Sequence, residues 1–121
     1  MENANLIKLI KAKGFDDYQN GLCSRFSSEE IIYNYHYEEK DSINSVVVFL
    51  EKGETKTRIE LNENGDLNFY YSRKGKENKR QFEYCSEDDF HIMLAHAFIY
   101  IRDGNFDYHK KWYSNLNVRE K

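Results

Sequence analysis

The sequence predicts one α+β domain of residues 1–121, in which a helix packs across an antiparallel β-meander of about five strands. Between residues 46 and 85, short segments of alternating apolar and polar residues are separated by turn residues, as in strands joined by hairpins. Before and after this region, apolar residues recur at helical spacing. A chain of 121 residues with 40% hydrophobic residues is long enough for a single core.

The hairpin at residues 57–71 fixes the predicted register. Its apolar residues are all odd-numbered: Ile59, Leu61, Leu67, Phe69 and Tyr71. Directly opposite residues of an antiparallel ladder share a face, so we expect Leu61 opposite Leu67, Ile59 opposite Phe69 and Thr57 opposite Tyr71. This parity requires an odd-numbered loop, Glu63-Asn64-Gly65, with Gly65 in the left-handed conformation that ends a type I turn with a bulge.

The elements before this hairpin are predicted from shorter patterns. Residues 4–13 form a first helix that ends at Gly14, followed by a polar connection at 16–21, a short strand at 22–26 and a turn at 27–30. Residues 31–38 alternate as a strand with Tyr33, Tyr35 and Tyr37 on one face. Residues 46–50 are apolar throughout, which is typical of a central strand covered on both faces.

After Tyr71, an even-numbered turn at residues 74–77 is expected to return the chain. The expected pairs are Phe69 with Phe82, Leu67 with Tyr84 and Tyr71 with Arg80, so that Arg80 lies on a tyrosine ring.

Ser86 opens the second predicted helix, with Asp89 completing a capping box, and Gly104 ends it. One broad apolar face should lie on the sheet, and it contains Phe90, Met93, Leu94, Ala97, Phe98 and Ile101. A second stripe contains Ile92, Ala95 and Ile99. This stripe is expected to be covered by the first helix, by residues 106–113 or by a partner protein, and residues 116–121 are expected to fray.

Composition restricts the location and the cofactors of the protein. No apolar stretch reaches the roughly 18 residues that span a bilayer, and residues 1–13 lack a signal-peptide core, so we expect a cytoplasmic protein without membrane contact. Cys23 and Cys85 are expected to be reduced, small buried residues, and no cofactor or metal site is expected. The net charge of −3 argues against non-specific nucleic-acid binding.

The residues with catalytic potential do not form a recognisable site. His91 and His96 would point about 140° apart on a helix and cannot share a metal. His36 and Glu38 lie on one strand face at the spacing of an acid–base pair. The sequences Glu38-Glu39-Lys40 and Glu77-Asn78-Lys79 match part of a Mg²⁺ nuclease site but lack the preceding aspartate. Either cysteine would need a positioned histidine to act as a nucleophile.

Charged residues suggest two binding surfaces. Basic residues follow Tyr70 and Tyr71, in a hairpin that could bind nucleic acid, and they are Arg73, Lys74, Lys76, Lys79 and Arg80. Acidic residues flank a predicted strand at its two opposite ends and form two corners near exposed tyrosines. The candidate partner-binding residues are Tyr35, Tyr37, Glu38, Glu39, Asp41, Glu51 and Glu54. Aromatic side chains supply apolar contact area and carboxylates steer a basic partner.

As a small, acidic, aromatic-rich α+β domain without a catalytic motif, the chain resembles the immunity proteins of bacterial polymorphic and contact-dependent toxin systems. The strand Ile31-Ile32-Tyr33-Asn34-Tyr35 and the capped helix after Ser86 belong to this resemblance. It implies a cytosolic protein that binds one cognate toxin domain, often a nuclease, and blocks its active site with acidic side chains that stand in for phosphates. We therefore expect a non-enzymatic toxin inhibitor. The alternatives are a small enzyme that uses His36 and carboxylates, a nucleic-acid-binding domain that uses the hairpin from Arg73, and an inhibitor of another class.

Overall fold

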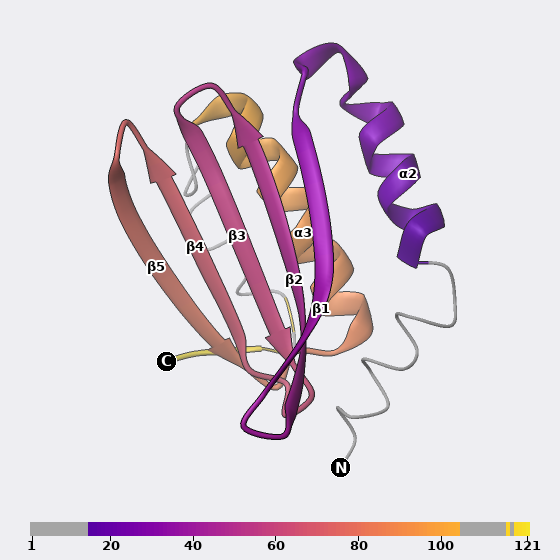
Figure 1. Ribbon diagram of the computed structural model, residues 1–121, viewed down its shortest axis with the longest axis vertical. Coiled ribbons are helices and arrows are strands. Elements are labelled where there is room, and N and C mark those ends of the chain that lie inside the picture. Colours follow the sequence, from indigo (N-terminus) through magenta and orange to yellow (C-terminus); the bar gives the residue numbers. More distant parts are fainter. Residues whose placement is uncertain (1–14, 105–115, 117) are drawn as a thin grey trace.

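The computed structural model describes residues 15–104, 116 and 118–121, and these form an antiparallel sheet with two helices (Figure 1). The strands lie in sequence order, β1-β2-β3-β4-β5-β6. The elements are α2 (Phe15–Arg25), a 3₁₀ turn (Ser27–Glu29), β1 (Ile32–Lys40), β2 (Ile43–Lys52), β3 (Thr55–Asn62), β4 (Leu67–Arg73), β5 (Lys76–Glu83), α3 (Glu87–Asp103) and β6 (Arg119–Glu120). The α+β prediction is confirmed. The predicted helix at 4–13 and the segment 106–113 lie outside the described residues.

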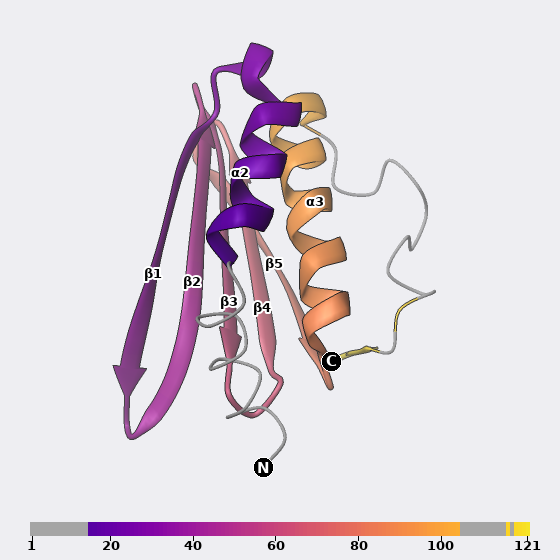
Figure 2. The ribbon, with the colours of Figure 1, turned by 90° about the vertical axis from the view of Figure 1, so that its right-hand side faces the viewer.

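Both described helices lie on the same side of the sheet (Figure 2), and α3 packs against β2 and β3. The predicted sheet-facing side of α3 is fully buried, with Phe90, Met93 and Leu94 at 0% exposure. The Ser86–Asp89 capping box is present, and Gly104 ends the helix with φ 72°. Of the second stripe, Ala95 and Ile99 pack against the core, whereas Ile92 is 42% exposed.

The middle hairpin has the predicted register. Leu61 lies opposite Leu67, Ile59 opposite Phe69 and Thr57 opposite Tyr71. The backbone N–H of Gly65 donates to the carbonyl of Asn62 over 3.0 Å, and Gly65 has φ 83°. The predicted loop is therefore correct: an odd-numbered loop places every apolar side chain of the hairpin on one face, and Gly65 supplies the positive φ that this loop needs.

The predicted β4–β5 register is wrong by two residues. Leu67, rather than Phe69, lies opposite Phe82, and Tyr71 lies opposite Asn78. The turn is even-numbered as expected, but it contains only Lys74 and Gly75, both with positive φ, as the tightest hairpin turns require. A shift of two residues preserves the face of every side chain, so hydrophobic alternation does not distinguish the two registers.

The predicted strand at 22–26 and the polar connection at 16–21 are wrong, because residues 15–25 form helix α2. Leu22 and Phe26 are both buried, and the Phe26 ring stacks on that of Phe98 at 5.4 Å between centroids. A spacing of four residues returns to the same face in a helix and also in a strand, so this pair fits both patterns. Contact with α3 decides between them.

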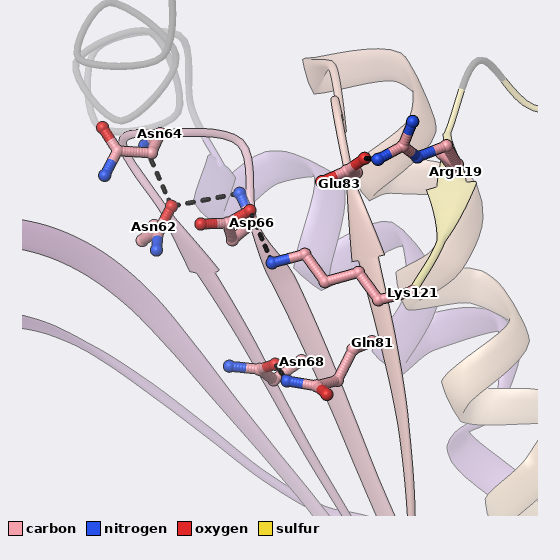
Figure 3. A network of polar contacts seen from close by, with 8 residues as sticks. All are labelled: Asn62, Asn64, Asp66, Asn68, Gln81, Glu83, Arg119 and Lys121. Carbon is pink, nitrogen blue, oxygen red and sulfur yellow. Dashed lines mark hydrogen bonds and ion pairs between the residues drawn. The ribbon is translucent and has the colours of Figure 1, made fainter.

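The last residues pair with β5 as strand β6, in contrast to the predicted fraying. Lys121 Nζ contacts Asp66 Oδ1 at 3.2 Å, and Arg119 pairs with Glu83 (Figure 3). On the other face, Arg80 Nη1 donates to Glu120 Oε1 over 2.9 Å, and Arg80 Nε lies 3.4 Å from the Tyr71 hydroxyl. Arg80 therefore contacts the tyrosine by its hydroxyl, although the two residues are not opposite each other.

The prediction that residues 46–50 form a central strand covered on both faces holds for Val47, which is 0% exposed, but not for Phe49. Strand β2 is second from the edge, between β1 and β3. Val46, Val48 and Leu50 lie in the core, whereas Phe49 on the other face is 36% exposed. Both helices of the described chain lie on one side of the sheet, and on the other side Val47 is buried while Phe49 reaches the surface.

Candidate protein-binding surface

We call the side of the sheet away from α2 and α3 the open face. Strand alternation and the observed register assign its side chains, because residues opposite one another share a face. Its charged residues in β1 to β5 are Glu38, Lys40, Glu51, Lys56, Arg58, Glu60, Glu77, Lys79 and Glu83. Charges of both signs are therefore interspersed over this face.

Six side chains of the open face form a continuous series of contacts, which we call the diagonal: Glu38, His36, Phe49, Arg58, Tyr70 and Lys79. His36 Nε2 lies 2.6 Å from Glu38 Oε1, and the His36 ring stacks on Phe49 at 5.5 Å between centroids. The Arg58 guanidinium lies 5.6 Å from the Phe49 ring centre and 5.7 Å from that of Tyr70. Lys79 Nζ is 5.1 Å from the Tyr70 ring centre. The diagonal thus runs from a carboxylate to an ammonium group.

Arg58 occupies the centre of the diagonal because the register places it directly opposite both Phe49 and Tyr70. Cations are attracted to the negative faces of aromatic rings, so the two rings hold the guanidinium against the sheet. Arg58 Nη2 donates to Glu60 Oε2 over 2.8 Å. Its Nε is buried and has no hydrogen-bond acceptor in the structure. A buried donor without a partner costs free energy, so the two aromatic rings and the Glu60 carboxylate must compensate for it.

A shallow hollow of about 230 Å³ adjoins Arg58 on this face. The open-face residues that line it are Phe49, Glu51, Lys56, Arg58, Tyr70, Ser72 and Glu77. Pockets for small molecules usually measure about 300–1,000 Å³. The hollow is thus below the usual size for a small-molecule site and suits a single side chain of a larger partner.

The acidic residues at the β1–β2 turn form one corner, which we call the acidic tip: Glu38, Glu39 and Asp41. Asp41 and Ser42 make the turn, both with positive φ. Successive residues of a strand point to opposite faces, so Glu38 lies on the open face with His36 and Glu39 lies on the helix side with Tyr37. Tyr37 is 37% exposed, whereas Tyr35 is half-buried and packs against the core.

The other two predicted acidic residues lie at the opposite end of β2. Glu51 lines the hollow, 4.0 Å from Lys56 Nζ, and Glu54 lies in the β2–β3 turn, where its carbonyl accepts from the backbone N–H of Lys74. Lys56 and Lys74 line a shallow depression together with Glu51 and Glu54. This corner therefore has mixed charge, and of the two predicted corners only the acidic tip is predominantly negative.

The hydrogen bond from His36 lowers the pKa of the Glu38 carboxyl below its ordinary value, with a smaller electrostatic contribution from His36, Arg58 and Lys40. The predicted His36–Glu38 pair is therefore in contact. Because both side chains are more than two-fifths exposed, the pair is a surface hydrogen bond, and it connects the acidic tip to the diagonal.

The other candidate catalytic residues remain separate. His91 and His96 lie on α3, on the helix side of the sheet. No group of three or more potential metal ligands occurs among the described residues, which include both partial nuclease motifs. Neither cysteine forms a disulfide. Cys85 is buried and Cys23 half-buried, and burial raises the pKa of each thiol, which opposes formation of a nucleophilic thiolate.

Two arginines of the basic hairpin contact other parts of the fold. Arg80 pairs with Glu120. The Arg73 guanidinium lies at the C-terminal end of α3, where a Cβ at Gly104 would be 2.8 Å from Arg73 Nη1 and where the helix dipole favours a cation. Lys74 lies in the turn and Lys76 follows it, both are exposed, and Lys79 belongs to the diagonal.

Phe49 and Arg58 belong to the surface contacts but are not among the residues that the sequence singles out. The apolar run at 46–50 predicts a buried Phe49, and Arg58 belongs to no motif. If the odd–even parity of β3 is extended to β2, Phe49 and Arg58 both fall on the open face, because residues opposite one another share a face. Tyr70 was noted for its ring, but its contact with Arg58 requires the register.

The comparisons with known proteins give no family assignment. No protein-family model matches the chain, and no significant match was found among curated proteins or solved structures. Within the described residues, no helix is both long enough and apolar enough to cross a membrane.

Proposed function

We propose that this protein is a non-enzymatic inhibitor that binds a cognate protein toxin in the cytoplasm, as the resemblance to immunity proteins implies. The observation that carries the proposal is the acidic tip at the end of the β1–β2 hairpin. Glu38, Glu39 and Asp41 are exposed there beside Tyr37. A basic partner would be steered by the carboxylates and would bury the tyrosine ring.

A nuclease toxin is the partner chemistry that fits this surface best. An active site that binds a polyphosphate chain is lined with cations, and closely spaced carboxylates offer those cations an alternative set of anions. Glu38 and Glu39 point to opposite faces of the β1–β2 hairpin, so the tip presents negative charge on both sides. It can therefore enter a basic cleft rather than only cover it.

The test requires the toxin domain encoded by a reading frame next to the gene for this protein. Co-expression of the two should restore growth of cells that the toxin alone arrests, and a catalytically inactive toxin variant should bind the purified protein in calorimetry. If wild-type protein neither restores growth nor binds this domain, the proposal is wrong.

The acidic tip has its own matched test. The double variant Glu39→Gln/Asp41→Asn removes two charges while keeping size, and Asn tolerates the positive φ of position 41. We expect about tenfold weaker binding, mainly because association is slower. The affinity of the variant should also depend less on the salt concentration. Glu30→Gln/Asp103→Asn removes two charges at the other end of the sheet and should bind like wild type. Equal loss in both variants would contradict a role for the tip.

A further inference from the structure

We propose that the hollow on the open face is the anchoring contact for the toxin, and that it takes an aromatic side chain flanked by a carboxylate of the toxin. This inference rests on the proposed function and extends the contact surface from the acidic tip along the diagonal.

The hollow is connected to the acidic tip through the side chains of the diagonal. Glu38 belongs to both the acidic tip and the diagonal, and His36, Phe49 and Arg58 connect it by direct contacts to the hollow. A partner steered to the tip would therefore meet this face next to its point of entry. Phe49 and Ile32 are exposed large apolar residues of the same face, at 36% and 65%. Their burial by a partner would contribute apolar contact area that the tip itself lacks.

The chemistry of the hollow defines the side chain that fits it. Phe49 and Tyr70 supply two aromatic walls, against which a third ring packs favourably. Lys56 lies beside them and is 61% exposed, with its Nζ 4.0 Å from Glu51 Oε1. Its ammonium group is therefore accessible to a carboxylate that lies next to the inserted ring.

The charges also distinguish a protein from single-stranded nucleic acid. Stacking of bases on Tyr70 beside Lys79 is the arrangement that would favour nucleic acid. However, Glu51 and Glu77 line the hollow itself, and Glu60 already pairs with Arg58. A phosphate chain must bring a negative charge with every nucleotide and would be repelled by these carboxylates. A protein segment can place one carboxylate near the cations and neutral or basic groups elsewhere.

The experiment uses the full-length protein and the catalytically inactive toxin domain of the neighbouring reading frame. Ser72→Trp should fill the hollow, and Phe49→Ala should remove one wall. We expect each to weaken toxin binding by about tenfold or more. Gln81→Trp places the same bulky side chain on the open face away from the hollow and should bind within about twofold of wild type. Urea unfolding of each variant shows whether it is folded.

The proposed carboxylate of the toxin is tested separately at Lys56. Lys56→Glu reverses one charge at the hollow and would repel this carboxylate, so it should weaken binding more than Lys56→Gln does. If folded Ser72→Trp and Phe49→Ala bind the toxin like wild type, the inference is wrong while the proposed function stands. If the wild-type protein does not bind the toxin, both are wrong. If a labelled oligothymidylate binds instead, and Tyr70→Ala abolishes this, the open face is a nucleic-acid site and the inference is overturned.

Discussion

The two faces of the sheet share one backbone but differ in chemistry and in burial. On the helix side, Leu67 and Phe69 are at 0% exposure and contribute to a continuous core. On the open face, the alternate residues of the same strand, Asn68 and Tyr70, form polar and ring contacts with their neighbours. Strand alternation thus places one set of residues in the core, where it stabilises the fold, and the other set on the face away from the helices.

The sharpest test of this difference compares two adjacent aromatic residues of β4. Phe69→Ala should reduce the free energy of unfolding by about 3–5 kcal/mol, because it leaves a cavity in a core that cannot collapse fully. Tyr70→Ala should cost less than about 1.5 kcal/mol, since the ring is only half-buried on the open face. Urea denaturation monitored by circular dichroism measures both. Similar losses would show that the open face also stabilises the fold.

A smaller effect is expected from the helix that covers the core. Ser86→Ala removes the side chain that accepts from the Asp89 backbone N–H at the start of α3, and should cost about 1 kcal/mol. Ser72→Ala makes the same change on the open face, where we expect a difference below about 0.5 kcal/mol. Thermal unfolding of the two variants compares them directly. A stable Ser86→Ala protein would mean that sheet contacts, not the cap, fix the first turn of α3.

The smallest effect concerns titration on the open face. His36→Leu should raise the pKa of Glu38 toward its ordinary value, because leucine cannot donate the hydrogen bond that lowers it. A carboxyl with a lowered pKa in the folded state stabilises the fold above its unfolded pKa, and this contribution is lost as the pH falls through the folded pKa. NMR titration of the Glu38 side chain in the two proteins measures the change. An unaltered pKa would show that Arg58 and Lys40 cause the shift.

Local patterns in the sequence predicted the features that depend on few residues. The register of the middle hairpin follows from parity and Gly65, and the limits of α3 follow from Ser86 and Gly104. The β4–β5 register and helix α2 were predicted incorrectly because the patterns there are degenerate. A shift of two residues retains every face, and the spacing of Leu22 and Phe26 suits a helix and a strand equally.

The same distinction applies to the candidate site. The sequence predicted the acidic residues of the tip and their separation from Glu51 and Glu54. The two groups lie at opposite ends of one strand, and a strand keeps its ends apart. The diagonal was not predicted, since it joins residues of five strands through contacts that alternate between aromatic rings and charged groups.

The sequence by itself determined the register and turn of the middle hairpin and how α3 begins and ends, because these depend on backbone geometry within a few residues. Only the tertiary structure decided which face of the sheet the helices cover and which side chains of distant strands meet at Arg58. The physical reason is that coverage depends on packing between whole elements, and the free energy of that packing is shared among residues far apart in the chain.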